Sequence, residues 1–267
     1  MLYVVGTPIG NLGDITLRAL ETLKKADVIL CEDTRHSLKL LNFYEIKKPL
    51  VAYHKFNERE ATERVLALLR EGKEVALISD AGMPLVSDPG AVLVARLKEE
   101  GLPFTVIPGT TAFVPALILS GFSAPFLFFG FLPDKKKDRR EALASLAGER
   151  ANLVFYCAPQ DVESTVKALY EAFGERRAAA VREITKIHEE AKEFLLSQGC
   201  PDARGEYVLI VEGSRKCDTS PEIGEKEEIE TLIASGMSKM DALKKVAKER
   251  GVPKSSLYRY TVKDEEE

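Results

Sequence analysis

The chain has 267 residues, of which 45% are hydrophobic and 30% charged, and its formal net charge is −4 at pH 7. These values are typical of one large or two ordinary globular domains, and they exclude a low-complexity chain. Apolar stretches such as 112–119 are shorter than the roughly 18 residues that a membrane helix needs, so we expect no membrane span. The first residues lack a basic segment, so we expect no secretory signal and a cytoplasmic protein.

The first half of the chain alternates short apolar runs with amphipathic helical patterns. Asp14 stands where the N-cap of the first helix is expected. Because βαβα alternation is typical of a parallel sheet covered on both faces, we predict a mainly parallel, doubly wound α/β domain. We predict strands over 2–5, 27–33, 49–54, 74–79 and 103–109, and helices over 15–26, 57–72, 91–101 and 110–121.

Near 121–125 the pattern restarts and indicates a second α/β domain, followed by a helical tail. The predicted boundaries are 1–121 for the first domain, 122–221 for the second and 222–267 for the tail. We predict strands over 126–132, 152–159, 178–184 and 207–213, and helices over 138–148, 161–174, 225–236, 238–251 and 252–260.

Three glycine- and proline-containing loops each follow an apolar strand and lead into a helix: "GTPIGN" (6–11), "SDAGMPLVSDPG" (79–90) and "PGTTA" (108–112). In an open α/β sheet such loops lie at the carboxyl ends of the strands, where ligands bind. Each loop also fits a structural turn. Asp88 before Pro89 has the pattern of a helix N-cap, and Thr110 or Thr111 is placed to cap the next helix or to donate to a ligand.

The negative charges of the second loop restrict which classes of ligand can bind there. The chain has neither a P-loop pattern nor a G-x-G-x-x-G turn after a strand. Carboxylates such as Asp80 repel pyrophosphate, but they accept hydrogen bonds from ribose hydroxyls and attract a cation. S-adenosylmethionine has a ribose, an amino group and a sulfonium and no phosphate, so it meets these requirements. The three histidines lack metal-ligand spacing, and we predict no metal site.

Seven segments carry a resemblance to a known family: "GTPIGNLGDITLRAL", "CEDTRHSLKLL", "HKFNE", "SDAGMPLVSDPG", "PGTTAFVPALILSGF", "GFLP" and "REITKIHEE". In this order they resemble the type I small-subunit ribosomal RNA methyltransferases of the tetrapyrrole methylase superfamily, over most of residues 1–214. The resemblance implies two α/β domains, a parallel N-terminal and a mixed C-terminal sheet, with S-adenosylmethionine in the cleft between them, and a homodimer. It also implies 2′-O-methylation of a cytidine ribose in the decoding region of 16S ribosomal RNA, within the small ribosomal subunit.

The resemblance also implies the cofactor contacts. In the second domain it points to the loop after the strand at 152–156 and to the turn at 212–214. Two positions depart from the family's pattern: Met83 replaces a usual threonine, and "YCAPQD" (156–161) replaces Y-E-x-P-H-R. The expected contacts are Pro8, Ile9, Gly10, Asp80, Ala81, Gly82, Ser87, Asp88, Gly109, Thr110, Thr111, Ala112, Tyr156, Glu212 and Gly213.

A ribose 2′-hydroxyl is a poor nucleophile while protonated, so a positioned base or charge stabiliser should assist its methylation. Candidates follow two of the predicted strands, in "CEDTRH" and "HKFNERE". The same residues fit structural roles, namely an N-cap with an ion pair in the first motif and a strand end in the second. The catalytic candidates are Asp33, Arg35, His54, Asn57 and Glu58.

Two basic segments suggest contact with a polyanion. The first, "KKKDRR", is predicted as a loop that is either simply solvated or contacts RNA phosphates through Lys135, Lys136, Lys137, Arg139 and Arg140. The second lies in the tail, at 239–259.

The tail resembles a helix–turn–helix, with Gly251 and Pro253 in the turn and Ser255 or Ser256 as a cap. Two helices are too few for an independent DNA-reading domain, so we expect an add-on that packs on the body or touches RNA. The alternatives to an RNA methyltransferase are a methyltransferase for a tetrapyrrole or another small molecule, and a non-catalytic RNA-binding protein on a methylase scaffold. The basic segments favour RNA.

Overall fold

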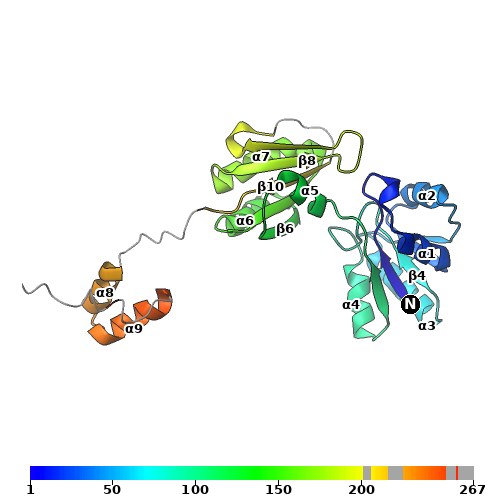
Figure 1. The fold of residues 1–267 in the computed structure, drawn as a ribbon. Coiled ribbons are helices and arrows are strands. Elements are labelled where there is room, and N and C mark those ends of the chain that lie inside the picture. The colour runs from blue at the N-terminus through cyan, green and yellow to red at the C-terminus, as the bar shows by residue number, and fades with distance from the viewer. Residues whose placement is uncertain (201–205, 216–224, 251–256, 258–267) are drawn as a thin grey trace, which may run out of the picture. The chain divides into compact units, whose positions relative to one another are not determined.

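The computed structural model describes residues 1–200, 206–215, 225–250 and 257 (Figure 1). They belong to two compact units, Met1–Ser214 and Arg215–Glu267, and each unit is described by itself.

The first sheet is parallel throughout, as predicted. Its strands follow the order β3-β2-β4-β1-β5, and Leu2 on β1 pairs with Val75 on one side and Phe104 on the other. All five carboxyl ends therefore meet at one edge, which is where the sequence predicts ligand-binding loops. The strands are β1 (Leu2–Val5), β2 (Val28–Cys31), β3 (Leu50–Ala52), β4 (Val75–Leu77) and β5 (Phe104–Ile107).

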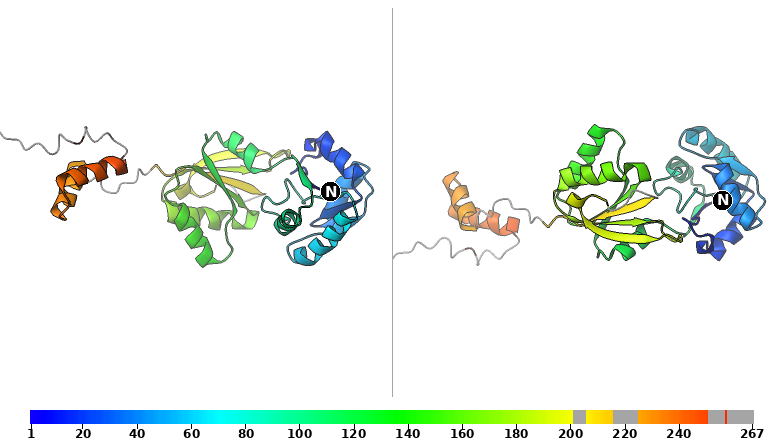
Figure 2. Two further views of the ribbon diagram at one scale, coloured as in Figure 1. Left: turned by 90° about the horizontal axis from the view of Figure 1, so that it is seen from below. Right: turned by 90° about the horizontal axis from the view of Figure 1, so that it is seen from above.

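Helices cover both faces of this sheet (Figure 2). On one face Leu23 of α1 (Leu17–Lys25) and Leu41 of α2 (Thr34–Phe43) join the core. On the other face Leu66 of α3 (Glu58–Arg70) and Leu97 of α4 (Ala91–Glu99) do so. The prediction did not include α2, which buries only Ser37 and Leu41 and so has a weak apolar pattern.

The expected N-cap of α1 was wrong. The Thr16 hydroxyl accepts the Ala19 N–H at 3.1 Å, and this bond starts the helix two residues after Asp14. Asp14 instead ends a short 3-10 turn, Leu12–Asp14. Threonine and aspartate are both good N-caps, so residue type alone did not decide between them.

The second sheet is mixed, as predicted. Its order is β6-β7-β10-β8-β9, with β6 parallel to β7 and the other pairs antiparallel. The prediction omitted β9, an edge strand in which charged side chains alternate with few apolar ones. The strands are β6 (Phe126–Phe131), β7 (Asn152–Cys157), β8 (Arg177–Arg182), β9 (Glu190–Leu195) and β10 (Tyr207–Val211).

This sheet is also covered on both faces. Helices α6 (Lys136–Leu146) and α7 (Val162–Phe173) pack on one face, and α5 (Phe113–Ser120) packs on the other. Leu117 of α5 belongs to the same buried cluster as Val154 and Ile210 of this sheet. The predicted boundary at residue 121 assigns α5 to the first domain, whereas its buried face contacts the second sheet.

The second unit contains α8 (Glu225–Ala234) and α9 (Lys239–Arg250), which match two predicted tail helices. Gly236 has φ +93° just after α8, a conformation that glycine adopts without strain. The predicted helix at 252–260, with the turn and cap residues Gly251, Pro253, Ser255 and Ser256, lies outside the described residues apart from Leu257. Across the described ranges, no helix has both the length and the apolar character to cross a membrane.

Candidate functional site

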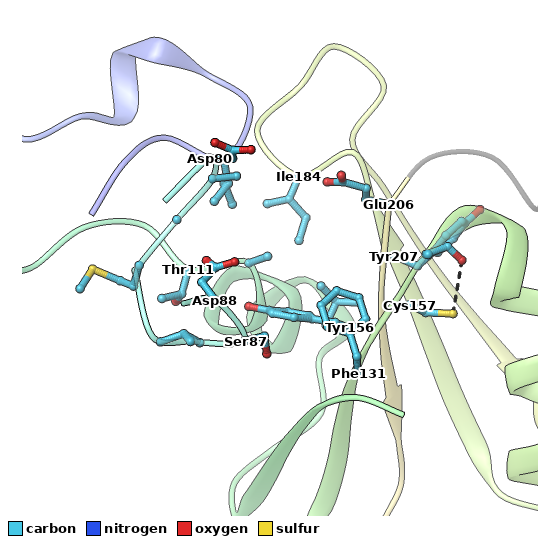
Figure 3. A pocket seen from close by; sticks show the side chains of 18 of the residues that line it. Asp80, Ser87, Asp88, Thr111, Phe131, Tyr156, Cys157, Ile184, Glu206 and Tyr207 are labelled. Atoms are coloured by element: carbon cyan, nitrogen blue, oxygen red, sulfur yellow. Dashed lines mark hydrogen bonds between the residues drawn. The ribbon is translucent and has the colours of Figure 1, made fainter. Parts of the chain in front are cut away.

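A cavity of about 300 Å³ is lined by loops of both sheets (Figure 3). Its volume lies at the lower end of the range for small-molecule sites. The first sheet contributes the loops after β1, β4 and β5, and the second contributes the ends of β6, β7 and β8 and the start of β10. The lining residues are Ile9, Asp80, Ala81, Gly82, Met83, Val86, Ser87, Asp88, Thr111, Ala112, Phe131, Tyr156, Cys157, Ala158, Pro159, Glu183, Ile184, Lys186, Glu206, Tyr207 and Val208.

Thr7 ties the three loops of the first sheet together. Its N–H donates to the Gly82 carbonyl at 2.9 Å, and the Gly82 N–H donates back at 3.1 Å. The Thr110 hydroxyl donates to the Thr7 carbonyl at 2.6 Å, which joins the third loop. Thr110 therefore bonds a neighbouring loop, and Ala112 occupies the N-cap of α5. Of the two roles considered for Thr110 and Thr111, capping is excluded, and Thr111 lines the cavity.

Two glycines bring these loops into backbone contact. A Cβ on Gly6 would lie 2.6 Å from the Gly109 Cα, and a Cβ on Gly109 would lie 2.7 Å from the Gly6 Cα. Gly109 thus holds the wall together and is not part of the cavity lining. Gly10 contacts the second sheet's loop, because its Cβ would lie 2.8 Å from the Lys186 Cγ. Pro8 also lies beside the lining without joining it.

Two of the cavity loops contain non-glycine residues with positive, strained φ angles. Leu85 and Ser87 have φ of 69° and 68°, and Glu183 and Thr185 have φ of 50° and 66°. In the described part of the chain only one other non-glycine residue, Glu45, has a positive φ. Such conformations cost about 1–3 kcal/mol each and concentrate at ligand sites.

Asp88 is a wall residue and not a helix cap, so that prediction was wrong. Helix α4 begins at Ala91 with Gly90 as its N-cap, at φ 129°. The carboxyl group of Asp88 is half-buried in the cavity. Its pKa is raised to about 6, first by burial and then by the charges of Glu32 and Asp80, while the hydrogen bond with the Ser79 hydroxyl lowers it. The Asp-Pro pattern suited a cap, but two strained residues and Gly90 delay the start of the helix.

The cavity wall is predominantly acidic. Asp80 accepts the Asp33 N–H at 3.2 Å and lines the cavity with Asp88, Glu183 and Glu206. Among the described residues of the wall, the one lysine is Lys186, whose ammonium lies 3.2 Å from the Glu183 carboxylate, which balances its charge. In Figure 3 Asp88 and Thr111 lie on the side of the cavity formed by the first sheet, opposite Glu206. A net negative, half-enclosed site favours a cationic ligand.

Glu32 does not line the cavity, but its charge acts on Asp88 in the wall, and the sequence did not predict this role. Its pKa is raised, first by burial and then by the charge of Asp80, while His54 lowers it. It stands directly after β2, next to the predicted candidate Asp33. Its position at the carboxyl edge of the sheet is the signal that could have found it.

Strand direction decides which end of β10 meets the cavity. Because β10 runs antiparallel to β7, Tyr207 pairs with Cys157 and Val211 pairs with Leu153. The first residues of β10 therefore line the cavity, and its last residues lie away from it. The expected contacts Glu212 and Gly213 lie at the other end of β10, outside the cavity lining, where the Gly213 N–H donates to Asn152 Oδ1 at 3.2 Å.

The loop after β8 supplies three wall residues that the sequence analysis did not assign: Glu183, Ile184 and Lys186. It begins the "REITKIHEE" segment, which carried part of the resemblance without a role of its own. Of the expected contacts in the second domain, Tyr156 does line the cavity, and burial raises the pKa of its phenol.

The five catalytic candidates, all of them described, are not among the residues that line the cavity. Asp33 is the N-cap of α2, accepting the Arg35 N–H at 2.8 Å. Its carboxylate also lies 2.9 Å from the Arg35 guanidinium. The hydrogen bonds from Arg35 lower the Asp33 pKa to about 2. The structural alternative, an N-cap with an ion pair, describes this geometry.

Asn57 and Glu58 also make structural hydrogen bonds. Asn57 accepts the His54 N–H at 2.8 Å and donates to the Ala52 carbonyl at 2.9 Å, which shapes the turn after β3. Glu58 accepts the Gly90 N–H at 2.8 Å and so anchors the loop that carries Asp88.

Arg35 and His54 differ from these residues. The Arg35 side chain is 89% exposed at the edge of the sheet that carries the cavity. The His54 ring is half-buried, and its Nδ1 has no hydrogen-bond partner among the described residues.

The basic segment after β6 begins a helix and is not a loop. Lys135 is the N-cap position of α6, and Lys136, Lys137, Arg139 and Arg140 lie in its first turns. Arg139 is half-buried and donates to the Pro133 carbonyl at 2.9 Å, whereas the other four are exposed.

Among the described residues, no group of three or more His, Cys, Asp or Glu side chains is placed to hold a metal ion.

A parallel and a mixed sheet whose loops enclose an acidic cavity define a two-domain α/β protein with a site for a small, cation-bearing ligand. The family model described as Tetrapyrrole (Corrin/Porphyrin) Methylases matches residues 1–198. The chain belongs to this family. It is a methyltransferase with S-adenosylmethionine as its cofactor, as the sequence analysis predicted.

Two curated relatives and one solved structure show the extent of the similarity. Ribosomal RNA small subunit methyltransferase I of Bacillus subtilis (strain 168) is 40% identical over 97% of this chain and 92% of its own. The protein of that name from Coprothermobacter proteolyticus is 42% identical over 81% of this chain and 99% of its own. Uroporphyrin-III C-methyl transferase from Thermus thermophilus, complexed with S-adenyl homocysteine, superposes with a TM-score of 0.58. It is 22% identical over 79% of this chain and 96% of its own, and supports the fold alone.

Proposed function

We propose that the protein methylates the 2′-hydroxyl of a cytidine ribose in the decoding region of 16S ribosomal RNA. The similarity to ribosomal RNA small subunit methyltransferase I, which runs through nearly the whole chain, carries this proposal. The small ribosomal subunit is then the partner, and the cytoplasm is the compartment where the two meet. A tetrapyrrole acceptor has weaker support, because solved uroporphyrin-III C-methyltransferases of Thermus thermophilus are 22–26% identical to the chain, against 40% for the Bacillus subtilis relative.

The residues of the cavity fit S-adenosylmethionine. When bound, it supplies a methyl group on a positively charged sulfur. The carboxylates of Asp80 and Asp88 favour that positive charge or the amino group, and they accept hydrogen bonds from ribose hydroxyls. The Thr111 hydroxyl adds a further polar contact, and apolar side chains such as Ile9 and Ile184 suit a flat purine ring. The described wall offers no uncompensated cation for a phosphate, which agrees with a cofactor that has none.

The acceptor hydroxyl must be held in line with the methyl group, since orientation supplies much of the rate of such a transfer. Asp33, Asn57 and Glu58 contribute as positioning residues, through the loops that they hold. Arg35 and His54 lie at the same edge of the sheet, and we assign them to contact with the RNA. An exposed guanidinium such as that of Arg35 suits a phosphate oxygen.

The start of α6 is assigned to the RNA backbone. Lys135, Lys136, Lys137 and Arg140 are exposed and follow β6, whose last residue lines the cavity. Arg139 supports this turn through its bond to the Pro133 carbonyl. Contacts of this kind fix the position of RNA without reading its sequence.

A homodimer accounts for an exposed apolar face on α5 and β6. Val114, Ile118 and Leu119 of α5 are 44%, 77% and 40% exposed, and Phe126 of β6 is 44% exposed. Phe113 links the two elements, with its ring 6.2 Å from that of Phe126. A second copy of the chain would remove these side chains from water.

Transfer of label to RNA tests the proposal. The protein is incubated with methyl-labelled S-adenosylmethionine and small subunits that lack the modification, and the RNA is then hydrolysed in alkali. A 2′-O-methyl group removes the internal nucleophile, so the label should remain in one alkali-resistant dinucleotide. Absence of label from RNA contradicts the proposal, and cofactor binding without transfer would favour a non-catalytic RNA-binding protein.

A further inference from the structure

The second compact unit has its own core and a lysine-bearing helix face. Lys244, Lys245 and Lys248 of α9 are exposed, and their spacing of three and four residues places them on one side of the helix. We call them the lysine face. The opposite side of α9 is buried with α8 and Leu257. This core consists of Ile229, Ala242, Leu243, Val246, Ala247 and Leu257.

The two helices described in this unit have opposite net charges. Helix α8 contains four glutamates and one lysine, and α9 contains five lysine or arginine residues and two acidic ones. The lysine face has an acidic neighbour in Asp241, whose carboxylate lies 3.9 Å from the Lys244 ammonium. Any anion that binds this unit should therefore meet α9 and not α8.

Relatives differ in how much of this chain they match. The Coprothermobacter proteolyticus relative is aligned over nearly its whole length, yet it leaves about a fifth of this chain unmatched. The Bacillus subtilis relative matches 97% of the chain, and both have the same name. The family model ends at residue 198, within the first unit. The methylase family model thus lies within the first unit, and the second unit lies outside it.

We propose that the lysine face of α9 binds the phosphate backbone of the RNA substrate and so tethers the substrate to the enzyme. This inference rests on the proposed ribosomal RNA function. Most apolar side chains of α9 lie in the core of the unit. Only Met240, which is 47% exposed, remains at the surface of the described helix, and one such side chain is too little to insert into a lipid surface. Compact ammonium groups without aromatic neighbours on the helix suit phosphates and not base reading.

The test is the full-length protein with Lys244→Gln, Lys245→Gln and Lys248→Gln together. Lysine and glutamine have similar helix propensities, so α9 should persist. Methyl transfer to small subunits is measured against subunit concentration at several salt concentrations. We expect KM for the subunit to rise while kcat and the affinity for S-adenosylmethionine stay unchanged. The slope of log affinity against log salt should fall by about two, because each phosphate that is no longer neutralised lowers it by roughly 0.7.

Two controls isolate the charge and its position. The variant with Lys244→Arg, Lys245→Arg and Lys248→Arg keeps the positive charge, so its KM and its salt slope should match those of the unaltered protein. The variant with Lys24→Gln, Lys25→Gln and Lys47→Gln removes the same charge from exposed positions of the first unit. It should change neither the KM for the subunit nor the salt slope. An unchanged salt slope in the α9 glutamine variant overturns the proposal. So does a loss of affinity for assembled subunits without one for protein-free RNA, since that outcome assigns the face to a ribosomal protein. If the unaltered enzyme transfers no label to RNA, the proposed function itself fails, and that result is distinct from both.

Discussion

At the scale of single residues, Asp80 and Asp88 show what a sequence pattern can and cannot predict about a site. Both were expected in the cofactor site, and both line the cavity. Their surroundings could not be read from the chain: Glu32 comes from another strand, and its charge adds to burial in raising the Asp88 pKa. An N-cap pattern is local, whereas a pKa depends on groups distant in sequence. The N-cap reading of Asp88 was therefore wrong, although its place in the cavity was expected.

The pKa of Asp88 predicts how cofactor affinity depends on pH. Below about pH 6 the carboxyl is neutral and attracts a cation weakly, and above it the carboxylate attracts a cation strongly. The dissociation constant of S-adenosylmethionine, measured by calorimetry, should therefore fall between pH 5 and pH 7. Asp88→Asn should weaken binding at pH 7 and abolish this pH dependence. The same pH profile in both proteins would remove Asp88 from cofactor binding.

The same carboxyl makes a prediction for stability. Its pKa is 3.8 in the reference state and about 6 in the fold, so the folded state binds the proton more tightly. Stability should therefore decline as pH rises from about 4 to about 6, because the buried group must ionise. Asp88→Asn removes this cost and should stabilise the fold at pH 7 by about 1 kcal/mol, after allowance for solvent screening. Thermal melts should show equal Tm values near pH 4 and a higher Tm for the variant at pH 7; a lower one there would contradict this.

A substitution at Asp33 can distinguish a positioning role from a role as catalytic base. A carboxylate with a pKa of about 2 is a weak base, and Asp33 is occupied by its bonds to Arg35. Asparagine caps helices as well as aspartate, and the bond from the Asp33 N–H to Asp80 uses only the backbone. Asp33→Asn should therefore retain kcat within a few-fold, with Asp33→Ala as the comparison that loses the cap. If the asparagine variant binds cofactor normally but no longer methylates, Asp33 is a catalytic base after all.

At the scale of helices and strands, the sequence predicted what depends on local periodicity. All five strands of the parallel sheet were predicted, because each is an apolar run followed by a turn. The direction of β10 was not, because an apolar strand has the same pattern in either direction. Its antiparallel pairing with β7 moves Glu212 away from the cavity and brings Glu206 to it. The weakly apolar α2 and the charged edge strand β9 were missed for lack of a periodic signal.

The exposed apolar face of α5 predicts the oligomeric state. Ile118 is 77% exposed and lies on a helix whose other side packs on the second sheet. If a second copy covers this face, Ile118→Lys places a charge in the interface, and sedimentation should show a monomer where the unaltered protein is a dimer. The exposed Leu17 of α1 is a matched control, since Leu17→Lys should leave the dimer intact. A dimer that survives Ile118→Lys would show that this face is not its interface.

At the scale of the whole molecule, two sheets with different connectivity enclose one site in the first unit, and the helical unit lies outside the region that the family model matches. Alternating strand and helix patterns predicted both α/β domains, and the order of motifs such as "SDAGMPLVSDPG" predicted the family. The part of the cavity wall that comes from the second sheet depends on pairing between strands distant in sequence, which a single sequence does not reveal. This pairing places the loop from Glu183 to Lys186 in the wall.

The most direct test of the account is the chemical identity of the methylated product. Small subunits lacking the modification are incubated with the protein and isotope-labelled S-adenosylmethionine, and the RNA is digested to nucleosides for mass spectrometry. We expect labelled 2′-O-methylcytidine at close to one per subunit, with Asp88→Asn needing more cofactor to reach the same yield. A label on a base, on a nucleoside other than cytidine, or on no nucleoside at all would contradict it.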